Sequence, residues 1–184
     1  MHPTRSGFLT DYGELAPIDK RDRVRITPVD ADALAGIDSF CIEPVEWLAD
    51  AMGQPATSEK RQVAMQDAFQ SALVEELGKI RPIVEEPGPQ TAVVRAAVTG
   101  VRESRPWVNL FLSAQIAGPL FNGGAAAEIE VLAADGRQIA AESAGFTGHD
   151  WDVIGYFWGP NHPRSALRQA ARRLARELEA CESP

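Results

Sequence analysis

The stretch TSEKRQVAMQDAFQSALVEELG (57–78), followed closely by TAVVRAAVT (91–99), decides the fold class of this chain. Residues 57–78 predict an amphipathic helix, because apolar residues recur every four positions, at Met65, Phe69, Leu73 and Leu77. Gly78 is a suitable residue to end this helix. Residues 91–99 are rich in β-branched residues and predict a strand. A helix between strands therefore indicates a protein that contains both element types.

The flanking segments add strands and a second helix. SFCIEPV (39–45) is an extended run before the first helix, and residues 126–131 and 137–145 predict a hairpin through Asp135-Gly136. A second helix with apolar residues on one face is expected after Pro163. We predict an α+β fold with two amphipathic helices packed on a mixed four- or five-stranded sheet. Residues 1–36 are expected to form an extended N-terminal arm, and residues 37–181 a single domain.

Composition excludes several classes of protein. The chain has 184 residues, 45% of them hydrophobic, and a net charge of −8, which argues against a general binder of nucleic acids or anionic membranes. Two cysteines cannot form a disulfide framework, and Cys41 is expected to be a buried thiol in a strand. No apolar window approaches the length of a membrane span, and the first residues lack the apolar core of a signal peptide.

Two aromatic or apolar segments are candidate binding surfaces. Residues 146–158 contain four large rings, at Trp151, Tyr156, Phe157 and Trp158. Such rings either form a platform for a partner or close one end of the core, and core closure is the commoner arrangement. Residues 107–121 are almost uncharged and contain Trp107 and Phe111 near their start. This second segment suits either a buried crossover or a contact surface.

The second predicted helix carries arginines at helical spacing, at Arg164, Arg168, Arg172 and Arg176. A solvated helix face is the ordinary reason for such a row, and docking of an acidic partner or phosphate is the alternative, with Arg168 and Arg172 as candidate binding residues. Nucleic-acid binding through this helix is disfavoured, since the rest of the chain is acidic and no aromatic residues for base stacking occur on the predicted sheet.

No catalytic motif stands out, and we expect no catalytic residues, cofactor or metal. The alternative is a metal-dependent enzyme using the loop with His149, Asp150 and Asp152, although this loop lacks the spacing of known zinc motifs. Glu128 and Glu130 lie on the same face of a predicted strand and form a carboxylate pair on paper. Acids that alternate with apolar residues usually mark a water-facing side of a sheet, and we interpret them in this way.

Several strings resemble a family of proteobacterial lipoproteins known as domain of unknown function 3313. They occur in the same order along residues 6–180: SGFLTDY (6–12), IEPVE (42–46), ALVEELG (72–78), EPGP (86–89), VRAAVT (94–99) and DGRQIAA (135–141). No single string is diagnostic, but their order and spacing make the resemblance specific.

The resemblance implies a small envelope protein without an established activity. It implies a periplasmic domain, anchored at the outer membrane in its full-length form through a lipid on a cysteine that is absent from this chain. A cytoplasmic location is the alternative. We therefore expect a non-catalytic domain that binds an envelope protein or associates with itself, does not bind nucleic acid, and meets a membrane only through that lipid anchor.

Overall fold

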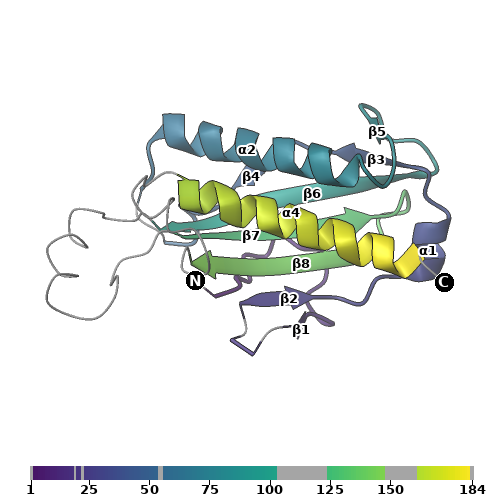
Figure 1. Ribbon diagram of the computed structural model, residues 1–184, viewed down its shortest axis with the longest axis horizontal. Helices are drawn as coiled ribbons and strands as arrows, with labels where there is room; N and C mark the ends of the chain where they lie inside the picture. The colour runs from purple at the N-terminus through teal and green to yellow at the C-terminus, as the bar shows by residue number, and fades with distance from the viewer. Residues whose placement is uncertain are drawn as a thin grey trace, which may run out of the picture.

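The computed structural model describes residues 2–18, 20–21, 23–53, 56–102, 124–147 and 161–182. In this part of the chain the strands form one eight-stranded sheet in the order β1-β2-β8-β7-β6-β3-β5, with β4 paired to β6 (Figure 1). The strands are β1 (Ala16–Pro17), β2 (Val24–Ile26), β3 (Ser39–Ile42), β4 (Glu46–Trp47), β5 (Ile83–Val84), β6 (Thr91–Arg102), β7 (Gly124–Leu132) and β8 (Gln138–Thr147).

The sheet contains both antiparallel and parallel pairs of strands. Strands β6, β7 and β8 form an antiparallel meander, and β2 adds to β8 in the same antiparallel sense. Strand β3 is parallel to both β5 and β6, and β4 is also parallel to β6. Parallel neighbours need a crossover connection, and helix α2 (Glu59–Leu77) supplies it between β4 and β5.

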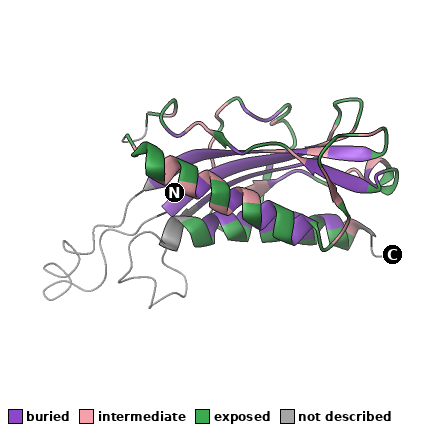
Figure 2. Ribbon diagram, turned by 90° about the horizontal axis from the view of Figure 1, so that it is seen from above, coloured by how far each residue is buried: buried purple, intermediate pink, exposed green. Residues whose placement is uncertain are grey.

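Two long helices cover one face of the sheet, as Figures 1 and 2 show. Helix α2 buries Met65, Phe69 and Leu73, as its periodicity predicts. Helix α4 (Asn161–Glu182) lies beside α2 and buries Leu174 and Leu178 over β7 and β8. Among the described residues, no helix is both long enough and apolar enough to cross a membrane.

The α+β class is confirmed. The prediction of two helices and four or five strands is too low for the residues that the structure describes. Strands β1, β4 and β5 have two residues each, and helix α1 (Ala31–Ala35) has five, so none is long enough to show periodicity in the sequence. Residues 2–36, predicted to be an arm, contribute β1, β2 and α1 and extend the sheet. The predicted hairpin at 135–136 is present, with Gly136 at a φ of 82° that favours glycine.

One ionisable side chain is buried between the sheet and α4. Glu142 on β8 is fully buried, one of its oxygens lies 3.4 Å from Nη1 of Arg173, and the other, Oε2, has no hydrogen-bond donor among the described residues. Burial raises the pKa of Glu142 from 4.5 to about 8, with Arg173 opposing the shift and Glu177 adding to it. The folded protein therefore favours the protonated carboxyl.

This burial predicts a fall in stability with rising pH. The unfolded chain releases the Glu142 proton near pH 4.5 and the folded chain near pH 8, so the free energy of unfolding should decrease between these values. The slope should approach about 1.4 kcal/mol per pH unit. Urea unfolding of Glu142→Gln should lack this decrease and show a more stable protein at pH 8. An unchanged pH profile in Glu142→Gln would contradict the assignment.

Candidate functional site

The face of the sheet opposite the two long helices carries two glutamates, for which the sequence pattern predicts the wrong environment. Glu128 and Glu130 on β7 point away from the helices, and the side chains of both are 0% exposed. The prediction that they face water is wrong. The reason is that the irregular N-terminal segment, residues 2–18, crosses this face and covers them. We call this segment the strap.

Glu128 is bound by side chains and backbone of the strap. Its Oε1 accepts hydrogen bonds from Thr4 Oγ1 at 2.8 Å and from the Ser6 backbone N–H at 3.0 Å. Its Oε2 accepts from Ser6 Oγ at 2.7 Å and from the Tyr12 hydroxyl at 2.6 Å. An ionised carboxylate offers about four acceptor positions, so these four bonds use its capacity.

Glu130 joins the strap to the sheet through a charged neighbour. Its Oε2 accepts from the Thr10 backbone N–H at 2.7 Å, and its Oε1 lies 2.7 Å from Nη1 of Arg95. The Arg95 guanidinium also lies 4.7 Å from the ring centroid of Phe8 in the strap. Such a cation over an aromatic face is attracted to it. The strap thus contacts both members of this partly buried ion pair.

Apolar contacts and a tight turn complete the strap. Phe8, Leu9 and Leu15 are buried in a small apolar cluster with Ala97 and Ala141 of the sheet. The chain turns at Gly7, whose φ of 86° disfavours any residue with a side chain. This turn brings the Gly7 N–H within 2.9 Å of the Tyr12 hydroxyl oxygen, which therefore accepts a bond while donating to Glu128. Burial and the bond to Glu128 raise the pKa of Tyr12.

Both carboxylates are thus committed to structural bonds, which limits their chemistry. A general base or a metal ligand needs a lone pair directed at substrate or metal. Glu128 directs its lone pairs at the strap, and Glu130 directs its own at the strap and Arg95. Within the described ranges there is also no group of three or more His, Cys, Asp or Glu residues placed to hold a metal ion. The two glutamates therefore hold the strap on the sheet. We call the bonds of Glu128 and Glu130 to the strap the latch.

Two of the predicted binding residues, Arg168 and Arg172, lie between the helices. Arg168 pairs with Glu75 of α2, and Nε of Arg172 lies 2.7 Å from Oε1 of Glu76. Hydrogen bonds from Lys79 and Arg172 lower the pKa of the Glu76 carboxyl. These ion pairs join α4 to α2, and a role of the two arginines in binding a partner stays a prediction.

The other predicted site residues lie outside the described residues. These are the aromatic residues of both candidate surfaces and the residues of the alternative metal loop: Trp107, Phe111, Trp151, Tyr156, Phe157, Trp158, His149, Asp150 and Asp152.

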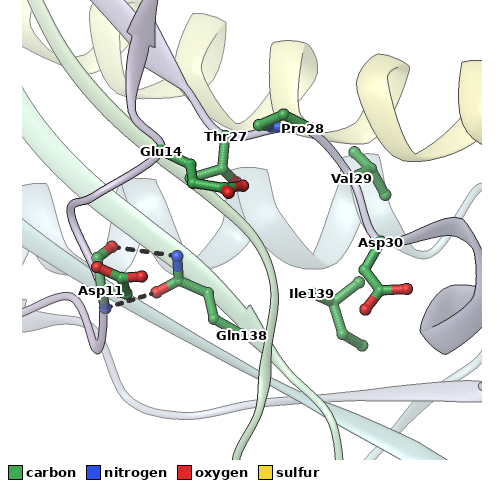
Figure 3. A pocket seen from close by; sticks show the side chains of 8 residues that line it. All are labelled: Asp11, Glu14, Thr27, Pro28, Val29, Asp30, Gln138 and Ile139. Atoms are coloured by element: carbon green, nitrogen blue, oxygen red, sulfur yellow. Dashed lines mark hydrogen bonds between the residues drawn. The ribbon is translucent and has the colours of Figure 1, made fainter.

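A small acidic pocket opens where the strap meets β8 (Figure 3). Its cavity volume is about 240 Å³, and its lining includes Asp11, Glu14 and Asp30. The backbone of Asp11 exchanges two hydrogen bonds with the side-chain amide of Gln138, at 3.0 and 3.1 Å. Asp30 caps α1 through the Ala33 N–H, so part of the acidic lining is also used structurally.

One feature of the sequence does indicate that this face of the sheet is covered. The strap-covered face carries Ala97 and Ala141 beside the two glutamates, and alanines are more typical of a covered surface than of a water-facing one. Small side chains let another segment of the chain approach the sheet closely. The strap itself has no periodicity that could identify it.

Comparisons with known proteins identify a family and a fold. A family model described as "Protein of unknown function (DUF3313)" matches residues 4–148, which include the strap and β7. A PelC dodecamer from Paraburkholderia phytofirmans is 13% identical, with a TM-score of 0.50, and the match covers 84% of this chain and 95% of that chain. A single-substitution variant of that dodecamer is 14% identical over the same shares, with a TM-score of 0.49. At these identities the likeness shows the fold alone. Among curated proteins, none matches the sequence.

Removing the acceptor of the latch should loosen the strap. Glu128→Ala leaves the donors of Ser6, Thr4 and Tyr12 without their acceptor, so we expect a loss of about 3 kcal/mol in the free energy of unfolding. Tyr12→Phe removes one of these bonds and should cost about 1 kcal/mol. Urea unfolding measures both changes, and trypsin cleavage after the exposed Arg5 should be faster in Glu128→Ala.

The exposed Glu86 provides a matched control, since Glu86→Ala removes a carboxylate elsewhere on the surface and should leave both measurements unchanged. Equal cleavage rates after Arg5 in Glu128→Ala and the wild type would show that Glu128 does not hold the strap.

Proposed function

The chain belongs to the DUF3313 family of unknown function, and on this premise we propose that it is a non-catalytic binding domain of the bacterial envelope. It acts by contact with a protein partner or with further copies of itself. The observation that carries this proposal is the latch, in which the two buried carboxylates of the strap-covered face accept hydrogen bonds from the strap.

The latch suits a domain that is held from its N-terminal side. The strap begins at residue 2 and is bound to the middle of the sheet through Thr4, Ser6 and Thr10. Force on the strap is therefore passed to β7, a central strand, rather than to an edge that frays easily. We propose a periplasmic location with attachment at the outer membrane in the full-length form, as the family resemblance implies, and the strap would be the side nearest to that attachment.

Self-association is the form of contact that the fold favours. PelC from P. phytofirmans, whose fold is similar, is a dodecamer. A fold that forms an oligomer elsewhere offers surfaces from which an oligomer can be assembled, although fold alone does not fix function. We therefore propose that this domain also forms oligomers, and that an envelope protein is the alternative partner.

Sedimentation velocity tests this proposal on the intact chain. We expect the sedimentation coefficient to increase with protein concentration, because reversible assembly follows mass action. Metal analysis of the same preparation should find less than one metal ion per chain. A single monomeric species at every concentration would contradict self-association, and a stoichiometric metal ion would contradict the absence of metal chemistry.

A further inference from the structure

The two ends of the sheet differ in charge and shape. At one end lie β1 and β2 with the described residues Ile18, Lys20 and Arg21 of their connection, which we call the basic edge. At the other end lie β5, the link between β3 and β4, and the side of α2 that faces away from α4, which we call the acidic edge. The strand order places these edges at opposite ends of the sheet, below and above the meander in Figure 1.

The basic edge presents an apolar side chain among positive charges. Ile18 is 52% exposed, the largest exposed fraction among the large hydrophobic side chains that the structure describes. Lys20 and Arg21 follow it closely and are also exposed. Residues 16–26 contain four basic and two acidic residues, a net charge of +2 in a chain whose net charge is −8. Ile18 is therefore an exposed apolar side chain with two exposed positive side chains close to it in the chain.

The acidic edge contains an apolar groove of about 390 Å³. Ile42, Pro44 and Val63 supply its apolar lining, and the side chain of Val63 is 49% exposed. The exposed carboxylate of Asp67 lies at its rim. Because β3 and β5 run parallel, with Cys41 beside Val84, the exposed Glu85 and Glu86 follow close to Ile42. The groove thus combines an apolar floor with a negative border.

The floor of the groove is fixed by hydrogen bonds. The side chain of Gln70 accepts a bond from the Val45 N–H at 3.1 Å, and that of Gln66 donates to the Val45 carbonyl at 2.6 Å. These two amides hold the link between β3 and β4 against α2. A surface held in place before binding loses less conformational entropy when a partner binds.

Strand addition does not explain a contact at either edge. Strands β1 and β5 have two residues each, and β1 contains Pro17, which lacks an N–H group. They offer too little backbone for a stable intermolecular ladder. A contact between copies therefore depends on side chains.

We propose that the basic edge of one copy binds the acidic edge of the next. Ile18 enters the groove against Pro44 and Val63, and Lys20 and Arg21 face the acidic residues of the neighbouring copy, Asp67 and Glu86. This proposal rests on the proposed self-association and specifies its surfaces. Each edge repels a second edge of its own kind, so the contact is head-to-tail, and a head-to-tail contact closes into a ring when its rotation permits.

Charge reversals on the intact chain test the contact. The basic-edge variant Lys20→Glu/Arg21→Glu and the acidic-edge variant Asp67→Lys/Glu86→Lys should each weaken self-association at least tenfold in Kd. Ile18→Ser should weaken it by a similar factor, since it removes the apolar side chain. The control is Arg164→Glu/Arg176→Glu, which reverses two exposed charges on α4 outside both edges and should leave Kd unchanged.

Restoration distinguishes this contact from a general effect of charge. In an equimolar mixture of the two edge variants, the reversed basic edge of one variant can bind the reversed acidic edge of the other. Their native edges can also bind each other, so assembly should recover. A chain carrying both sets of reversals should also assemble. Association of the wild type should weaken in about 1 M NaCl, where exposed charges are screened.

These experiments distinguish a failure of the proposed self-association from a failure of the head-to-tail contact. A wild type that stays monomeric at all concentrations would remove the proposed self-association together with this contact. A wild type that assembles, with edge variants that assemble equally well, would overturn the head-to-tail contact alone and leave the proposed function standing. Loss of assembly in both variants without recovery in their mixture would also overturn it.

Discussion

The structure depends on the burial of two carboxylates, Glu128 and Glu130, on a sheet face with no helix over it. An ionised carboxylate loses its hydration when it is buried, and this costs several kcal/mol unless donors replace the water. The strap provides these donors through Ser6, Thr10 and Tyr12, with Arg95 as the counter-ion. The order of an otherwise irregular segment is thus a consequence of charge burial.

The two faces of the sheet meet the same problem in different ways. Under the helices, Glu142 has a single long contact with Arg173 and its pKa rises to about 8, so the neutral acid is the stable form over most of the physiological range. Under the strap, Glu128 accepts four hydrogen bonds, two on each oxygen. The helical face thus holds a carboxyl with few donors, whereas the strap supplies a full set of donors to its carboxylate.

Local patterns predicted the elements whose boundaries are set locally. The stripe from Met65 to Leu77 predicted α2, and the turn residue Gly136 predicted the hairpin. Strands such as β4 and β5 have two residues and exist only because a neighbour pairs with them, so no periodicity could reveal them. The alternation of Glu128 and Glu130 is the same for a wet face and for a face covered by a strap. The burial of these glutamates is a tertiary effect that their own alternation along the strand does not reveal.

The most direct test of the latch is amide hydrogen exchange at Ser6 and Thr10, whose N–H groups bond to the buried carboxylates. These amides lie outside any helix or strand, so only the latch can protect them. We expect both to exchange far more slowly than the same amides in an unstructured peptide, approaching the protection of the central strands. Exchange at the rate of an unstructured peptide at both residues would contradict the account.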